Sequence, residues 1–208
     1  MHNMPVQQFL DELASAAPTP GGGGAAAIMG AMGAALISMV ANLTIGKKGY
    51  EGVEGEMKSQ LAAAEALRAR LTDMVADDVN AFNQLMAAYK LPKETDDDKA
   101  ARSEAIQESL KQATRVPLAC AHACADVIRV AQRSAEHGNR SVISDTGAGV
   151  LAVQAALRTA ALNVGINVPS IKDATFAAVA QQEIDTLLNE CLPLTEAVLA
   201  RVQARMVA

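Results

Sequence analysis

The fold follows from residues 18–50, which read PTPGGGGAAAIMGAMGAALISMVANLTIGKKGY. This stretch holds four consecutive glycines, an uncharged apolar segment from residue 25 to residue 45, and a turn with two lysines and a tyrosine. Small residues recur at every fourth position of the apolar segment and would form one stripe to which another helix backbone can come close: Ala26, Gly30, Ala34 and Ser38. The pattern predicts a Gly/Ala-rich helix that is buried on all sides.

Glycines 21–24 precede this helix and carry no side chains, so their backbone N–H groups can approach an anion or a flat ligand. Two other interpretations stay open, namely a flexible linker and a membrane span, because the apolar run is about long enough to cross a bilayer. The run nevertheless lacks an aromatic belt and begins at glycines whose backbone groups lipid cannot satisfy. We therefore expect a ligand-binding loop and no membrane contact.

The composition favours a single all-α domain over residues 1–208. Half of the 208 residues are hydrophobic and only 2% are aromatic, so the core must be built from small and flexible side chains on closely packed helices. The net charge of −5 and the few aromatic residues argue against a nucleic-acid partner. The expected architecture is an up-and-down-like helical bundle around the Gly/Ala-rich helix.

The cysteines and histidines do not predict a metal site. Cys120, Cys124 and Cys191 are odd in number and are interpreted as reduced thiols in the core, while the three histidines are scattered along the chain. No charged region followed by an apolar stretch begins the sequence, so we expect no secretory signal and a cytoplasmic location.

Hydrophobic periodicity and breaker residues place the remaining helices. Thr95, followed by three aspartates, has the form of an N-cap, and Pro117 is expected to kink or restart the helix that begins there. Residues 164–168 are interpreted as an extended link. The expected helices share a period near 3.6 residues and cover residues 6–13, 56–89, 96–115, 117–137, 145–162, 173–189 and 192 onward.

Asp78 is the unusual carboxylate of the long helix over residues 56–89. It lies four residues from both Met74 and Phe82, on the apolar face, whereas the neighbouring Asp77 falls on the polar side. A charge directed at a core or cleft costs several kcal/mol unless it is paired or used. Asp78 is therefore either part of a structural ion pair or a functional residue.

A second informative segment covers residues 138–147. Ser144 is a candidate N-cap, which would place Asp145 in the first turn and leave Asn139 and Arg140 in the preceding loop. Ordinary capping and a functional role both remain open for Asp145. Further along the chain, Asn163 and Asn167 can offer amide groups to a ligand or satisfy a turn.

These segments together resemble the cyclodeaminase/cyclohydrolase family, which includes the C-terminal domain of formiminotransferase-cyclodeaminase and stand-alone methenyltetrahydrofolate cyclohydrolases. The resemblance covers nearly the whole chain and depends on the joint order and spacing of its motifs. They are PTPGGG at residues 18–23, the helix over residues 30–40, GKK at residues 46–48 with Tyr50, Asp78-x-x-x-Phe82, LPK at residues 91–93, and residues 138–145.

The resemblance implies an all-helical homodimer that binds a folate, with no cofactor beyond the tetrahydrofolate substrate and no metal. It implies that the catalytic residues are Asp78 as general base, with Asp145 as the alternative, and Lys48, which would position water or relay a proton. The substrate-binding residues that it implies lie around the glycine run, the basic turn and the loops near residues 140 and 167: Pro20, Gly21, Gly22, Gly23, Lys47, Tyr50, Asn139, Arg140, Ser144 and Asn167.

The family resemblance leaves two reactions open. Methenyltetrahydrofolate cyclohydrolase adds water to the cationic carbon between N5 and N10, and formiminotetrahydrofolate cyclodeaminase closes the same bridge with release of ammonia. A chain of 208 residues has no room for a transferase domain, so we expect the cyclohydrolase. A non-catalytic helical dimer is the third interpretation, and an Asp78 paired with an internal Arg or Lys, with no open cleft beside Lys48, would favour it.

Overall fold

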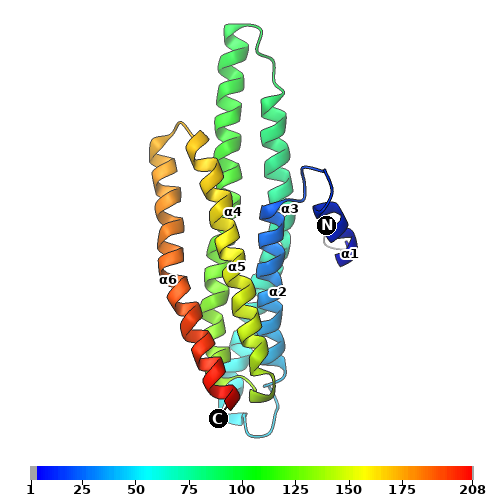
Figure 1. Cartoon of the computed structure of the whole chain (residues 1–208), viewed down its shortest axis with the longest axis vertical. Coiled ribbons are helices and arrows are strands. Elements are labelled where there is room, and N and C mark those ends of the chain that lie inside the picture. The colour runs from blue at the N-terminus through cyan, green and yellow to red at the C-terminus, as the bar shows by residue number, and fades with distance from the viewer. Residues whose placement is uncertain (1–3, 208) are drawn as a thin grey trace.

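A computed structural model describes residues 4–207, and this part of the chain contains helices and no strand (Figure 1). Five long helices follow a short amphipathic one, which packs Phe9 against the bundle. The α-helices are α1 (Val6–Leu13), α2 (Gly22–Asn42), α3 (Glu54–Tyr89), α4 (Asp96–His137), α5 (Ile143–Asn167) and α6 (Ala174–Val207). Short 3₁₀ turns cover Glu51–Val53, Arg140–Val142 and Val168–Ser170. The predicted all-α class is confirmed.

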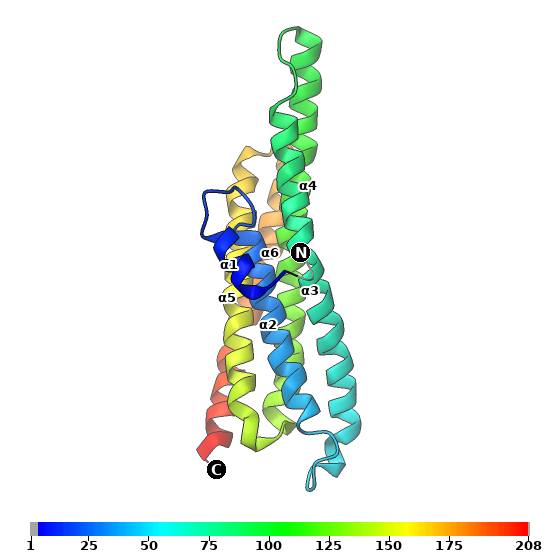
Figure 2. The same cartoon turned by 90° about the vertical axis from the view of Figure 1, so that its right-hand side faces the viewer.

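The long helices run alternately up and down along one axis (Figure 1). Helix α2 packs between α3 and α5, α4 contacts both α3 and α5, and α6 closes the bundle against α4 and α5. The upper parts of α3 and α4 continue beyond the other helices as a two-helix arm (Figure 2). The bundle therefore places the N-terminal end of α2 beside the middle of α3 and α4 and beside the C-terminal end of α5.

Helix α2 has one buried face and one exposed face. The small residues Ala26, Gly30, Ala34 and Ser38 are all buried, and a β-carbon at Gly33 would overlap Val153 of α5, so glycine is required for this close approach. On the outward face, 58% of Met32 is exposed, and Met39 and Leu43 are exposed as well. Within one chain, the prediction that this helix is packed on all sides is therefore wrong.

Both internal prolines lie within continuous helices, which corrects the predicted breaks at Pro117 in α4 and near Pro193 in α6. Proline has no N–H to bond the carbonyl four residues earlier, so Pro117 leaves the Ala113 carbonyl without its helical donor. The Asn167 side chain donates to that carbonyl at 2.9 Å. This bond from α5 explains how α4 continues through Pro117.

Two further boundaries differ from the predictions. Residues 164–167 belong to α5 rather than to an extended link, because Val164 is fully buried in the core on the inner face of this helix. Ser144 is not an N-cap: Asn139 caps a 3₁₀ turn by accepting from the Ser141 N–H at 3.0 Å, so helical backbone begins before Ser144. Asp145 does lie in the first turn of α5, as predicted.

Other local predictions are confirmed. Thr95 caps α4 reciprocally with Asp98: its hydroxyl accepts from the Asp98 N–H at 3.1 Å, and the Asp98 carboxylate accepts from the Thr95 N–H at 3.0 Å. Cys120, Cys124 and Cys191 are buried free thiols. The neighbouring Cys120 and burial raise the pKa of the Cys124 thiol well above its ordinary value, which keeps it protonated.

Candidate active site

A pocket of about 330 Å³ lies at the N-terminal end of α2, where α3, α4 and α5 converge. Its walls combine apolar side chains with a small number of polar groups, as is common in sites for small organic ligands. The lining residues are Pro18, Thr19, Gly21, Gly22, Gly23, Asp78, Ala81, Phe82, Leu85, Ala113, Pro117, Asn163, Ile166 and Asn167. The structure thus brings five of the predicted site residues into one cavity: three glycines, Asp78 and Asn167.

The glycine run is the first turn of α2 rather than a separate loop, since only Gly21 lies outside the helix as its N-cap. Gly22 and Gly23 occupy the first two helical positions, where a backbone N–H has no carbonyl within the helix. A β-carbon at Gly23 would overlap the Asp78 carboxylate. Glycine is therefore required for this carboxylate to lie directly against the helix end.

Asp78 extends from α3 toward this helix end, and its Oδ2 accepts from the Gly24 N–H at 2.9 Å. Partial burial raises the pKa of Asp78 above the ordinary 3.8, and the bond from Gly24 opposes part of that rise. Within residues 4–207 no Arg or Lys pairs with Asp78, so the ion pair that would favour a purely structural role is not formed. A partly desolvated carboxylate that faces a cavity is suited to bind a cation or to act as a base.

Asn163 and Asn167, one turn apart on α5, both line this pocket. The Asn163 Nδ2 donates to the Thr159 carbonyl at 2.8 Å, and the Asn167 Nδ2 donates to the Ala113 carbonyl at 2.9 Å. A carbonyl can only accept, so the NH₂ end of each amide must face it. The two Oδ1 atoms remain available as acceptors.

The other predicted site residues lie at the opposite end of α2. Lys47, Lys48 and Tyr50 follow this helix in an exposed turn, which Gly46 and Gly49 make possible with φ values of 71° and 89°. The Tyr50 hydroxyl accepts from the Arg140 N–H at 2.9 Å, and the Arg140 guanidinium donates to the Arg205 carbonyl. Ser144 and Asp145 lie in the first turn of α5, directly after the Arg140–Val142 turn.

Asn139 and Pro20 are used inside the protein in ways that the sequence does not reveal. Asn139 is buried; its N–H donates to the Thr44 hydroxyl at 2.8 Å, and its side chain donates to the Leu43 carbonyl at 2.8 Å. These bonds join the end of α2 to the start of α5. Pro20 is buried against Gly24 and does not line the pocket, so it shapes the helix start from behind.

The two groups of predicted residues cannot meet within one chain. Helix α2 separates them by its 21 residues, or about 30 Å at 1.5 Å per residue. Lys48 therefore lies far from Asp78, and a lysine side chain of about 6 Å cannot span the gap. Either Lys48 has no part in the pocket, or a second copy of the chain supplies it.

Several lining residues were not predicted as site residues, although sequence signals existed for some of them. Phe82 lies one turn beyond Asp78 on the apolar face, and Ile166 lies between the two asparagines, so helical spacing alone points both toward the pocket region. Thr19 directly precedes the glycine run. Pro117 and Ala113 come from α4, and nothing in the sequence indicates that this helix borders the glycines.

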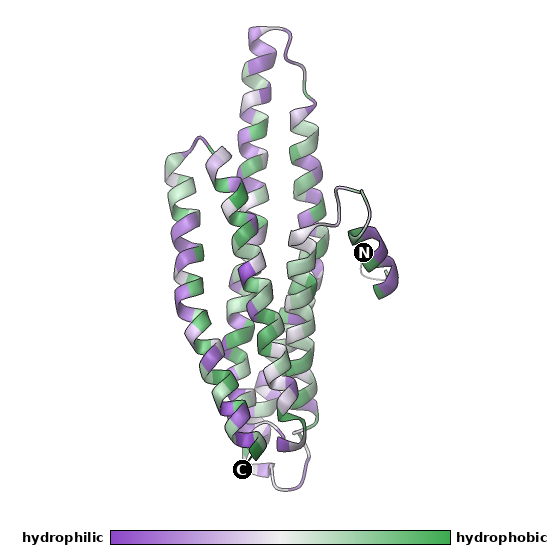
Figure 3. Ribbon diagram, in the orientation of Figure 1, coloured by the Kyte–Doolittle hydropathy of each residue, from purple (hydrophilic) through white to green (hydrophobic). Residues whose placement is uncertain are grey.

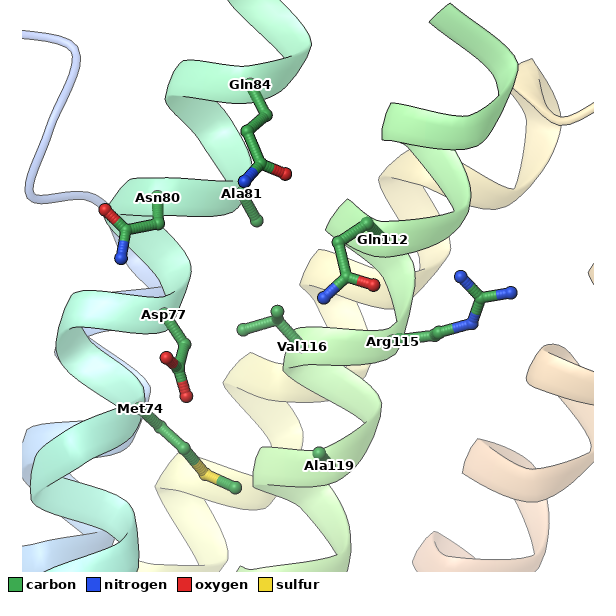
Figure 4. Close-up of a pocket in the computed structure, with 9 residues that line it drawn as sticks. All are labelled: Met74, Asp77, Asn80, Ala81, Gln84, Gln112, Arg115, Val116 and Ala119. Atoms are coloured by element: carbon green, nitrogen blue, oxygen red, sulfur yellow. The ribbon is translucent and has the colours of Figure 1, made fainter. Parts of the chain in front are cut away.

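A larger groove of about 460 Å³ lies on another side of the contact between α3 and α4 (Figure 4). Figure 4 shows Asp77 and Gln84 of α3 on the side that faces Gln112 of α4, while Asn80 and Arg115 point away. Asp77 is exposed, and the glycine helix end does not reach this groove. The partly buried carboxylate and the free backbone N–H groups place the candidate active site in the smaller pocket instead.

Two features of residues 4–207 bear on other classes of function. Residues 4–207 contain no group of three or more His, Cys, Asp or Glu side chains arranged to hold a metal ion. Two stretches, Gly22–Asn42 and Arg140–Ser170, match membrane spans in length and hydropathy, but 61% and 39% of their apolar windows are buried inside the bundle. A core helix passes the same test, so this match is weak evidence for a membrane.

Comparison with known proteins agrees with the geometry. The family model for formiminotransferase-cyclodeaminase matches residues 5–186. The chain is 54% identical over 204 residues to a methenyltetrahydrofolate cyclohydrolase of Methylorubrum extorquens, and the match covers 98% of both chains. It is 38% identical to a formimidoyltransferase-cyclodeaminase of Sus scrofa; this match covers 97% of the chain but only 37% of that longer relative.

The fold has also been seen in a solved structure. A formiminotetrahydrofolate cyclodeaminase from Thermotoga maritima superposes with a TM-score of 0.83 and is 34% identical in sequence. The superposition covers 99% of this chain and 96% of the other. The similarity therefore extends over the whole bundle.

Proposed function

Because the chain belongs to the formiminotransferase-cyclodeaminase family, we propose that it is a methenyltetrahydrofolate cyclohydrolase, which hydrolyses 5,10-methenyltetrahydrofolate to 10-formyltetrahydrofolate. The observation that carries the proposal is the unpaired, partly buried carboxylate of Asp78 in a pocket with free backbone N–H groups. The substrate carries a positive charge shared by N5, N10 and the carbon between them. A carboxylate without its own cation is suited to receive that charge.

The proposed mechanism uses Asp78 as the general base. The carboxylate takes one proton from water as the water oxygen bonds to the bridging carbon, which yields a neutral tetrahedral adduct. The adduct hydroxyl then becomes the formyl oxygen as the bond from carbon to N5 breaks and N5 takes up a proton. One proton is released overall, and the cationic carbon needs no metal ion to activate it.

The alternative reaction passes through the same carbon. In a formiminotetrahydrofolate cyclodeaminase, N10 attacks the formimino carbon on N5, and ammonia leaves. The longer relatives are named formimidoyltransferase-cyclodeaminases, whereas this chain matches the Methylorubrum cyclohydrolase over 98% of that protein. The chain also covers 96% of the Thermotoga cyclodeaminase, but it is 34% identical to that protein and 54% identical to the hydrolase. The higher identity to the hydrolase supports the hydrolytic reaction.

A direct assay distinguishes the two. We expect purified protein to accelerate the loss of the near-ultraviolet absorbance of 5,10-methenyltetrahydrofolate at neutral pH, and to release no ammonia from 5-formiminotetrahydrofolate. Ammonia release together with uncatalysed decay of the methenyl compound would instead identify a cyclodeaminase. Activity toward neither compound would support the non-catalytic helical dimer.

We further propose that the enzyme is a homodimer that forms through the exposed face of α2 and α5. Large apolar residues lie along this face from the pocket to the basic turn: Ile166 and Leu162 (each 74% exposed), Met32, Leu151, Met39 and Leu43. Figure 3 shows mostly green and pale ribbon along both helices. Exposed apolar residues gathered on one face, here interrupted by the exposed Arg158 of α5, commonly mark an interaction site.

A second copy of the chain would also explain why the predicted site residues lie at opposite ends of α2. A twofold axis across the middle of α2 would pair its two copies in antiparallel orientation. The Lys48 turn of one copy would then lie near the glycine helix end of the other. The apolar face reaches both ends, because Ile166 lines the pocket and Leu43 adjoins the basic turn.

The substitution Met32→Glu tests this interface. Met32 lies at the middle of α2, so near a twofold axis two glutamates would face each other in an apolar contact. We expect sedimentation velocity to show a monomer with an unchanged helical circular dichroism spectrum and little hydrolase activity. Val179→Glu on α6 is the control, because 48% of this apolar residue is exposed outside the proposed face, and it should leave a dimer. A dimeric Met32→Glu variant would contradict the proposed interface.

A further inference from the structure

The pocket contains a built arrangement of acceptors that the proposed reaction does not use. Asn163 and Asn167 both line it, at positions one helical turn apart on α5, where β-carbons are about 5–6 Å apart. Each NH₂ group is tied to a backbone carbonyl, so each oxygen is fixed as a free acceptor. Neither Oδ1 receives a hydrogen bond from the described part of the chain.

The bonds that orient these amides differ in their importance to the fold. Asn167 satisfies the Ala113 carbonyl, which Pro117 deprives of its helical donor, so its orientation is fixed by α4. Asn163 bonds the Thr159 carbonyl one turn earlier in its own helix. Loss of the Asn163 bond leaves α5 and α4 intact, and Asn163 is therefore the residue to vary.

From this geometry we infer that the two amide oxygens bind the exocyclic 2-amino group of the pterin ring, an inference that depends on the proposed folate function. The two hydrogens of an amino group diverge by 120°, so two acceptors at about 2.9 Å from its nitrogen lie about 5 Å apart. Methenyltetrahydrofolate has other N–H groups, but only the 2-amino nitrogen carries two hydrogens. The pair thus matches one group of the substrate.

The remaining polar groups agree with this orientation. Asn163 lies beside Gly22, and Asp78 lies beside Gly23 and Gly24. The two acceptor side chains therefore lie at different positions along the N-terminal end of α2. With the amino group at Asn163, the opposite side of the pterin, which carries N5 and the cationic carbon, faces Asp78. The free N–H groups of Gly22 and Gly23 lie between them, where the pterin 4-oxo oxygen needs donors. The apolar side chains Phe82 and Pro117 supply flat walls.

The test compares folate ligands that differ only at this group. We would measure the Kd of 5-formyltetrahydrofolate, which does not undergo the reaction, and of its 2-desamino-2-methyl analogue by calorimetry. Wild-type protein should bind the analogue about 10- to 100-fold more weakly, because two hydrogen bonds are lost and two acceptors are left unpaired. Asn163→Leu should reduce that preference by about tenfold. Asn163→Asp keeps an acceptor and should retain the preference, although it loses the bond to Thr159.

The control is Asn83→Leu on an exposed part of α3, which should behave as wild-type. Equal affinity of wild-type protein for both ligands, or a full preference in Asn163→Leu, would overturn the inference while the proposed function stands. Failure of wild-type protein to bind 5-formyltetrahydrofolate at all would overturn the folate function and the inference with it. Loss of the preference in Asn163→Asp would also overturn the inference, because it would show that Asn163 acts only through its bond to the Thr159 carbonyl.

Discussion

Asp78→Asn should lower kcat/KM for methenyltetrahydrofolate by about 10²- to 10⁴-fold, because the variant lacks the base that takes a proton from water. The amide oxygen of asparagine can still accept from the Gly24 N–H, so the helix end and the pocket should keep their shape. Stopped-flow loss of the methenyl absorbance measures the effect. The neighbouring Asp77→Asn is the matched control, since Asp77 is exposed on the other groove and should be dispensable.

The same substitution has a second expected effect, on stability, whose sign follows from the raised pKa of Asp78. Between the ordinary pKa of 3.8 and the higher folded-state pKa, the folded protein binds more protons than the unfolded chain. Stability is therefore lost as the pH rises through this window. Asp78→Asn removes the buried charge, so its Tm should exceed that of the wild type at neutral pH, and the difference should shrink below the ordinary pKa.

These two readouts separate a catalytic role from a structural one. A residue that only supports the fold would lower activity and Tm together when replaced, whereas Asp78→Asn is expected to lower activity and raise Tm. The kcat/KM of the wild type should also fall as the pH drops through the raised pKa of Asp78, because the base becomes protonated. Full activity of Asp78→Asn would remove Asp78 from the mechanism.

Much of the fold could be predicted from local sequence, and the errors have physical causes. The small-residue stripe of α2 and the capping box at Thr95 depend on nearby residues, so they were predictable. The continuity of α4 through Pro117 depends on Asn167, more than fifty residues away, and periodicity cannot reveal such a bond. Likewise, residues 164–167 are β-branched or flexible by type, yet burial of Val164 keeps them helical.

In the candidate site, too, some features follow from local sequence and others depend on contacts between distant residues. Asp78 was singled out by its place on an apolar face, a property of one helix alone. That Asp78 meets the glycine helix end could be expected only from the family resemblance, and the contact depends on the packing of α2 against α3. The distance between Lys48 and Asp78 was not predictable at all, because the sequence does not show that α2 runs straight between them.

A mixture of two inactive variants should recover activity if the proposed dimer builds its sites from both subunits. Asp78→Asn and Lys48→Ala would each inactivate both sites of their own homodimer. In a heterodimer, the intact Asp78 of one subunit would face the intact Lys48 of the other and restore one of two sites. Random pairing of equal amounts makes half of the dimers mixed, so about a quarter of the wild-type activity should return.

The measurement uses two affinity tags, co-expression and sequential purification, which isolate the heterodimer. Its activity should approach half that of the wild type, while each variant purified alone stays inactive. If Asp78 and Lys48 act within one subunit, every site of the heterodimer lacks one of them, and no activity can return. The roughly 30 Å along α2 argues against that arrangement, because no side chain bridges it and α2 is held straight between α3 and α5. An active Lys48→Ala homodimer would instead show that the site needs no lysine, and the pocket around Asp78 would then be complete within a single chain.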